Sequence, residues 1–345
     1  LMSNTAFRRD INDPQTITDF CAVVKSVERL RLLLLLTVAD IRAVGPDVWN
    51  AWKATLLRDL YEAAEELLSS GHSAQGRFAR IEHAKQKMGD LLSDLPVKSV
   101  DAHIARGYPS YWLSFDPDTL ARHARIAHEA ELCAAPLTIK NRVDRFKGAT
   151  EVMIYAHDHP GLFSRITGAM ALSGGNIVDA KIFTTTDGMA LDTFWVQDKD
   201  GEPFDSADKL ARFYARIDQT LAGRLRPREE LEKNGSFRGQ TQVLKIAPRV
   251  LIDNKASRTH TVIEVNGRDR NALLYDLTRA LYALNLQVAS AHISTFGEAA
   301  VDVFYVKDLF GLQIMNTNKL DQIRKTLLVV MQDDGDSMDM PEAAE

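Results

Sequence analysis

The chain has few of the residues that mark disulfide-stabilised or zinc-binding proteins. It contains only two cysteines, Cys21 and Cys133, in 345 residues, and their spacing matches no metal-binding motif. So few cysteines are typical of the reducing cytosol, which predicts a cytoplasmic location. No G-x-G-x-x-G follows a predicted strand, so the sequence does not indicate a dinucleotide-binding fold.

Long hydrophobic runs and an excess of positive charge are also missing. The longest apolar stretch, Leu32 to Ile41, is interrupted by Thr37 and Asp40. It is far shorter than the ~20 residues that cross a bilayer, so we interpret it as a buried helix. The formal net charge of −5 provides no general attraction for nucleic acid or for an anionic membrane.

Residues 1–148 follow the periodicity of helices, and no part of them predicts a strand. Leu56, Leu60 and Ala64 recur at helical spacing. Asp116 followed by Pro117 is typical of a helix N-terminus. We therefore expect an all-α segment over residues 1–148.

From residue 149 onward, strand and helix patterns alternate, and the alternation occurs twice. Asp187-Gly188 indicates a hairpin turn between two β-rich segments. Strands are expected at 151–156, 181–186, 191–196, 260–265, 288–295 and 301–306, and helices at 162–172, 207–221, 273–284 and 319–328. Each unit has the order β-α-β-β-α, which predicts two α+β modules of the ferredoxin-like type.

An internal repeat relates the two modules. Asp158 and Asp269 stand at the same point of the pattern, with an offset of 111 residues. After the hairpin the offset falls by one, so that Asp192 matches Asp302 within the phrases LDTFWVQD and VDVFYVKD. Agreement across both a helix and a hairpin indicates a true repeat.

The repeat suggests boundaries for the modules. We expect the first module at 149–235, a linker or the last strand of that module at 236–258, the second module at 259–335 and an acidic, disordered tail at 336–345. Arg249 to Ile252 is the candidate for the last strand of the first module. The second module has no clear candidate.

A turn in the first module carries a family resemblance. Residues 158–163 (DHPGLF) resemble the D-x-P-G-L turn of ACT domains, and Asn176, directly after Gly174-Gly175, adds to the match. The resemblance implies that an amino acid binds between paired modules. The matching positions are Asp158, Gly161, Leu162 and Asn176 in the first module, and Asp269 and Gln287 in the second.

The residue types in this motif suit a zwitterionic ligand. Gly161 opens a helix, where free backbone N–H groups and the helix dipole favour a carboxylate. Asp158 can hold the ammonium group, and Asn176 can both donate to and accept from the polar end of the ligand.

A purely structural interpretation of the motif stays open. Asp158 can be a turn residue and Gly161 an ordinary helix-start glycine. In the second module, Asn271 replaces the proline and Ala272 the glycine. The second module can therefore serve mainly as a packing or dimerisation partner.

The helical segment contains one candidate metal ligand. Residues 37–43 (TVADIRA) resemble the last metal-binding position of HD-type phosphohydrolases, with Asp40 as the ligand. No His-Asp pair precedes Asp40, since His72 is the first histidine. Without the resemblance, Asp40 is interpreted as a buried acid paired with an arginine. His157 and His159 have no clustered partners in the sequence and are expected to be loop histidines.

The resemblance extends over nearly the whole chain. Residues 8–14 (RRDINDP), 36–61 and 108–112 (YPSYW) are similar to the family of bifunctional PII uridylyltransferase/uridylyl-removing enzymes. The similarity implies that the chain is the C-terminal part of such an enzyme, with the end of an HD domain followed by two ACT domains. Its opening, Leu1-Met2, is unusual for a native protein and fits a fragment.

This family resemblance also implies substrates and partners. One domain of these enzymes transfers UMP from UTP to a tyrosine of the PII signal-transduction protein, and the HD domain removes it with a divalent metal, Mg or Mn. Glutamine at the ACT domains favours removal, and the ACT domains allow self-association. Since neither catalytic site is complete in these residues, the chain alone is expected to be inactive.

Three alternatives remain at this point. Guanosine tetraphosphate synthetase/hydrolases also combine HD and ACT domains, but they usually carry one ACT domain after a small β-rich domain. A metabolic dehydrogenase or hydroxylase with a regulatory ACT tail would need cofactor motifs that are absent here. A non-enzymatic amino-acid sensor fits these residues taken by themselves.

Overall fold

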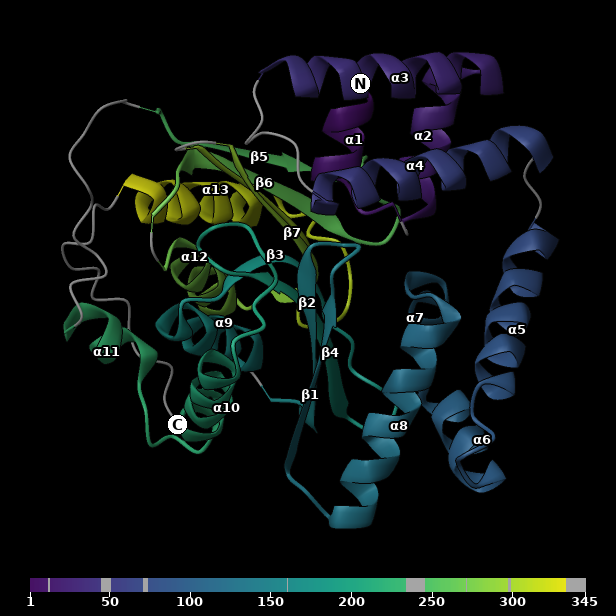
Figure 1. The fold of residues 1–345 in the computed structure, drawn as a ribbon. Coiled ribbons are helices and arrows are strands. Elements are labelled where there is room, and N and C mark those ends of the chain that lie inside the picture. The colour runs from purple at the N-terminus through teal and green to yellow at the C-terminus, as the bar shows by residue number, and fades with distance from the viewer. Residues whose placement is uncertain are drawn as a thin grey trace.

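The computed structural model describes residues 1–11, 13–44, 51–70, 74–159, 161–233, 246–270, 272–296 and 299–332. The predicted acidic tail at 336–345 lies outside the described residues. The centre of the molecule is one antiparallel sheet of eight strands, with helices on both faces (Figure 1). Among the described residues, no helix is long and apolar enough to cross a membrane.

The first module begins earlier than the sequence predicted. Its elements are β1 (Leu137–Asp144), β2 (Ala149–His157), α9 (Leu162–Ser173), β3 (Asn176–Lys181), β4 (Met189–Gln197), α10 (Ala207–Leu221) and α11 (Pro227–Lys233). The expectation that residues 1–148 contain no strand is wrong, because β1 pairs with β2 along its whole length. β1 is a half-exposed edge strand whose apolar alternation, Leu137, Ile139 and Val143, is interrupted by Asn141 and mixed with charged residues, so the pattern is weak.

The second module has the same order of elements. It consists of β5 (Arg249–Asp253), β6 (Thr261–Arg268), α12 (Leu273–Ala283), β7 (Gln287–Phe296), β8 (Ala299–Lys307) and α13 (Thr317–Gln332). The prediction that Arg249 to Ile252 closes the first module is wrong, since β5 pairs with β6. Each module therefore carries its fourth strand at its N-terminal end, in the order ββαββα.

The prediction of a strand at 181–186 is also wrong. β3 ends at Lys181, and beyond it only an isolated bridge joins Thr184 to Ala190. The strand was hard to recognise because its buried positions include the charged side chains of Asp179 and Lys181, which lie at the boundary between the modules. The predicted turn at Asp187-Gly188 is confirmed, since Gly188 has φ +80 and its N–H bonds to the carbonyl of Thr185 at 3.0 Å.

The two modules join edge to edge through β3 and β7. The strand order is β1-β2-β4-β3-β7-β8-β6-β5. The first four strands belong to the first module, and the last four are the equivalent strands of the second module in reverse order. α9 and α12 lie side by side on one face, where Thr167 and its repeat equivalent Thr278 share a buried hydrogen bond of 3.0 Å (Figure 1). One hydrophobic core, from Val152 to Val330, runs beneath the helices of both modules.

The N-terminal helices cover the opposite face of the sheet. They are α1 (Met2–Arg8), α2 (Pro14–Val24), α3 (Val27–Val44), α4 (Ala51–Ser70), α5 (Ala74–Asp90), α6 (Val97–Arg106), α7 (Pro109–Ser114) and α8 (Pro117–Cys133). α1 contacts the second module, where Arg8 pairs with Glu264 at 3.2 Å and the Asp10 N–H donates to the Tyr305 hydroxyl at 2.8 Å. α8 packs on β1 and β2 of the first module.

The expectation that Leu32 to Ile41 forms a buried helix is only half right. The stretch is helical within α3, but Leu32, Leu35 and Leu36 are 60%, 68% and 68% exposed. Leu30 and Ile41 on the other side of α3 are buried against its neighbours. α3 lies on the outside of the helical group, so only one of its two apolar faces finds a partner in the described residues (Figure 1).

A buried hydrogen-bond chain fastens the helices α6 to α8 to the first module. The Tyr111 hydroxyl bonds to His103 Nε2 at 2.9 Å and to His123 Nδ1 at 3.1 Å, and His123 Nε2 bonds to Thr193 Oγ1 of β4 at 2.9 Å. Burial lowers the pKa of His103 to about 4 and the pKa of His123 well below its ordinary value. Both imidazoles are therefore neutral at pH 7 and depend on these bonds for their polar partners.

Replacement of Tyr111 by Phe should destabilise the chain by about 1–3 kcal/mol, because two buried imidazole nitrogens lose their partner. Urea unfolding monitored by circular dichroism measures this change. Tyr108→Phe is the matched control, since Tyr108 is 51% exposed and should lose almost nothing. Equal unfolding midpoints for the two variants would contradict the role assigned to Tyr111.

Candidate functional site

The loop after β2 brings three of the predicted ligand-binding residues together. The Asp158 N–H bonds to the Gly188 carbonyl at 3.1 Å, and Thr184 Oγ1 donates to Asp158 Oδ2 at 2.6 Å. Gly161 has φ +82, a conformation that favours glycine, and it precedes Leu162 at the start of α9. The Leu162 N–H donates to the carbonyl of His159 at 3.1 Å, and within the described residues no side chain caps this helix start, so the amides that follow Leu162 are the ones an anion could use.

Asn176 lies far from Asp158, contrary to the expectation that the two face one another. On β4, Asn176 is opposite Gln197, whereas His157 at the end of β2 is opposite Met189. Eight strand residues at ~3.3 Å each place Asn176 roughly 26 Å from the Asp158 loop. The sequence did not reveal this separation. β3 runs parallel to β2, so Asn176 at the start of β3 lies at the end of the sheet opposite to the loop that follows β2.

The second module supplies the missing polar residue. β7 runs antiparallel to β3, with Lys181 opposite Ser290, and the Ile182 N–H bonds to the Ala289 carbonyl at 2.9 Å. Gln287, the first residue of β7, lies three residues before Ser290, on the side of the seam toward Thr184, whose hydroxyl bonds to Asp158. The start of β7 in the second module is therefore directed toward the helix-start loop of the first module, and by the repeat the start of β3 is directed toward that of the second.

This arrangement defines two corners. The first corner consists of Asp158, Gly161 and Leu162 of the first module with Gln287 of the second. α12 also reaches it, because a Cβ built on Gly161 would lie 3.5 Å from the Tyr282 ring. Pro160, the remaining residue of the motif, lies outside the described residues.

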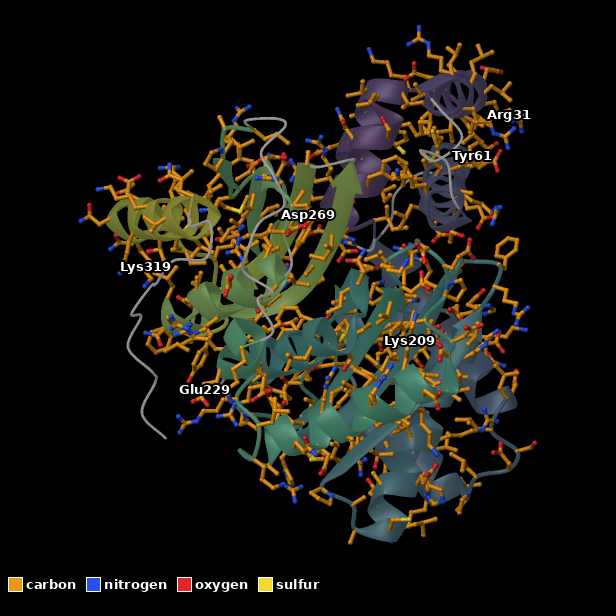
Figure 2. All side chains as sticks on the ribbon, turned by 60° about the vertical axis from the view of Figure 1, so that its left-hand side comes forward. Arg31, Tyr61, Lys209, Glu229, Asp269 and Lys319 are labelled. Atoms are coloured by element: carbon orange, nitrogen blue, oxygen red, sulfur yellow. The ribbon has the colours of Figure 1, made fainter. Side chains whose placement is uncertain are left out.

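The second corner consists of Asp269, Ala272 and Leu273 with Asn176 of the first module, and apolar side chains fill it. Leu231 of α11 is 1% exposed and packs against Ala272 and Tyr275. The first corner has the small Ser164 where the second has Tyr275. Figure 2 shows Glu229 of α11 and Asp269 on the side of the molecule where the second module lies. Asn271 lies outside the described residues.

Both modules are similar to known protein domains. Residues 150–212 match the model of the ACT domain, and residues 249–334 match an ACR9-like, ACT-like domain. The chain is 56% identical over 96% of its length to the bifunctional uridylyltransferase/uridylyl-removing enzyme of Azospirillum brasilense, and 51% over 95% to that of Gluconobacter oxydans. It spans about a third of these relatives, 36% and 35% of their lengths.

Over nearly its whole length, the chain is homologous to part of the bifunctional uridylyltransferase/uridylyl-removing enzymes. It carries two ACT-type domains, as the sequence predicted. The first match begins at β2, the second strand of its module, and the second match begins at β5, the first strand of its module. The two corners are thus the contact regions of a paired set of ACT domains.

Two buried aspartates were not recognised as site residues from the sequence. Asp192 on β4 and Asp302 on β8 are 1% and 2% exposed. Burial and the nearby charges of Asp158 and Asp269, respectively, raise the pKa of each carboxyl well above its ordinary value. The signal that pointed to them was their repetition inside two strand phrases that are otherwise apolar.

The candidate metal ligand Asp40 has no complete site around it. Asp40 is exposed on α3, so the alternative interpretation of a buried acid is wrong. Among the described residues there is no group of three His, Cys, Asp or Glu side chains able to hold a metal ion, around Asp40 or near His157 and His159. Among the described residues, Asp40 therefore forms no metal site by itself.

A polar pocket of about 440 Å³ lies elsewhere, between the start of α8 and the hairpin of β1 and β2. Most of its charged groups already have partners. Arg122 pairs with Glu151 at 2.8 Å, Asp116 caps α8, and Asp144 accepts the amide N–H of Lys147 at 2.9 Å. The pocket is therefore mainly a junction of structural ion pairs between the helices and the first ACT domain.

The buried aspartates predict an unusual dependence of stability on pH. A carboxyl whose pKa is raised by folding holds a proton that the unfolded chain has already lost. Its cost to stability is therefore absent below about pH 4 and grows as the pH rises, by at most about 1.4 kcal/mol per pH unit per carboxyl. The double variant Asp192→Asn/Asp302→Asn should gain stability over the wild type as the pH rises from 4 to 7.

Urea unfolding of both proteins at several pH values gives this difference. Groups such as His260, whose pKa burial lowers to about 4, act in the opposite sense but equally in both proteins, so they cancel. A difference that stayed constant across the pH range would show that Asp192 and Asp302 titrate normally.

Proposed function

We propose that this chain is the glutamine-sensing C-terminal portion of a cytoplasmic bifunctional uridylyltransferase/uridylyl-removing enzyme acting on the PII protein. The observation that carries the proposal is the paired arrangement of the ACT domains. In this arrangement Asp158 and the start of α9 in one domain would share a site with Gln287, which begins β7 of the other domain at the seam. Relatives over nearly the whole chain have names that include both activities.

The first corner is the proposed glutamine site. The backbone N–H groups that follow Leu162 at the start of α9 would take the carboxylate, since no side chain caps them and the helix dipole favours an anion. Gly161 has no Cβ, and the ring of Tyr282 packs over it, so a ligand that binds here would contact Tyr282 as well. Gln287, which is exposed at the start of β7, would bond to the polar end of the ligand. The second corner is filled by Leu231 and Tyr275, which argues for a packing role.

Glutamine would regulate the enzyme by binding one arrangement of the domains better than another. A ligand shifts an equilibrium only by its difference in affinity for the two states. The first corner spans both ACT domains, so a ligand there senses their relative position. The transfer of UMP from UTP to PII, and its removal with Mg or Mn, would be carried out with residues beyond those of this chain, and Asp40 would supply one metal ligand.

Isothermal titration with glutamine tests the site. Gln287→Ala should weaken glutamine binding by about 10- to 100-fold, because it removes a hydrogen bond to the ligand. Asn176→Ala is the matched control at the equivalent position of the other ACT domain, and it should leave the affinity unchanged. The reverse ranking would place glutamine at the second corner, and no binding by the wild type would refute the sensor function.

A second test concerns catalysis. The purified chain, supplied with Mg or Mn, should release no UMP from uridylylated PII, because no His-Asp pair precedes Asp40 to complete the metal site. Release of UMP is measured by mass spectrometry of PII. A rate comparable to that of a full-length relative would show that the residues of this chain form a complete hydrolytic site.

A further inference from the structure

Asp192 is a buried carboxyl whose oxygens are poorly satisfied by the described residues. It is 1% exposed, and across the described residues neither of its oxygens has a partner of good geometry. The amide of Phe183 lies near enough to favour ionisation somewhat, but burial outweighs it. At the equivalent point of the second ACT domain, Oδ1 of Asp302 is also unpaired.

Such a group is costly to keep in a fold. An unpaired buried polar group typically destabilises a protein by about 1–3 kcal/mol. Two less buried aspartates of the same repeat are well bonded. Asp198 and Asp308, six residues further along, accept backbone N–H groups of their turns at 2.9–3.1 Å. A buried carboxyl oxygen without a well-placed partner thus recurs at the equivalent positions of Asp192 and Asp302.

The position of Asp192 places its side chain behind the first corner. Asp192 lies on β4 between Ala190 and Phe194, both of which face the helix layer. It is opposite Ile154, three residues before the end of β2. α9 starts just beyond that end, and Asp158 is close enough to repel the charge of Asp192. The uncapped helix start and an unpaired carboxyl are thus combined in one corner.

We propose that Asp192 receives the ammonium group of the amino acid that binds at the first corner, while the amides at the start of α9 take its carboxylate. This inference rests on the proposed function and names the group that selects a zwitterion. An ammonium group has three donors, enough to serve both oxygens of Asp192 and one of Asp158. It also removes the repulsion between the two carboxylates. A metal ion is a poorer occupant, since the described residues provide no third ligand.

A ligand-binding role and a structural role predict opposite effects on stability. If Asp192 serves the ligand, Asp192→Leu replaces an unpaired polar group by an apolar one of similar size. The ligand-free variant should then melt at a higher temperature than the wild type. A structural carboxyl would instead leave its partners unpaired when it is removed, and the melting temperature would fall.

Binding experiments on the full chain use three ligands. Glutamine has both charges, glutaramic acid lacks the ammonium group, and 4-aminobutyramide lacks the carboxylate. Asp192→Asn should weaken the binding of glutamine and 4-aminobutyramide by about 10- to 100-fold and leave the affinity for glutaramic acid unchanged. Asp302→Asn is the matched control, equally buried but behind the filled second corner, and it should bind all three ligands as the wild type does.

The outcomes separate this inference from the proposed function. The role of Asp192 would be overturned if Asp192→Asn lost affinity equally for glutamine and glutaramic acid. It would also be overturned if Asp302→Asn lost as much affinity for glutamine as Asp192→Asn does. A wild type that binds no amino acid refutes glutamine sensing. In that case the amine 4-aminobutyramide still tests Asp192. Binding by the wild type that is lost in Asp192→Asn supports an amine site at Asp192, and no binding by the wild type overturns that site.

Discussion

The edge-to-edge pairing of β3 with β7 is the interaction on which the rest of the structure depends. Only three residue pairs form the regular ladder, from Asp179 opposite His292 to Lys181 opposite Ser290. The seam is reinforced by an ion pair of 2.9 Å between Asp179 and His292, and coulombic attraction to Asp179 and Asp10 raises the pKa of His292 despite the opposing effect of burial. It joins two four-stranded sheets over one core, so that β3 and β7 are inner strands of an eight-stranded sheet rather than its edges.

The same seam decides where ligands can bind. Because β3 and β7 are antiparallel, each corner is made by a loop of one ACT domain and a strand start of the other. A single ACT domain would hold only half of either corner. The helices α1 and α8 contact different ACT domains on the opposite face, so the N-terminal segment also spans the pair. Binding at a corner can thus be coupled to the helices only through the relative position of the domains.

The two corners have diverged although the fold repeats. Gly161 at the first corner has the equivalent Ala272, which keeps the same left-handed conformation with φ 63 at a steric cost of about 1–2 kcal/mol. Tyr275 and Leu231 then fill the second corner from α12 and α11. The buried carboxyls Asp192 and Asp302 persist in both ACT domains. The backbone is thus the same in both ACT domains, whereas the side chains at the two corners differ. Only the second corner is filled by Tyr275 and Leu231.

Local patterns in the sequence determined most of the elements, since helix periodicity, caps and turns depend on near neighbours. The helix 207–221, the cap at Asp116 and the repeat were all predicted and are confirmed. Two features were not predicted. One is the module to which each edge strand, β1 and β5, belongs, and the other is the separation of Asp158 from Asn176. Strand partners and distances across a sheet arise from contacts between residues far apart in the chain, so only the tertiary structure decided them. It also decided that Asp192 lacks a partner and that Leu231 fills the second corner, because burial depends on what packs above each residue.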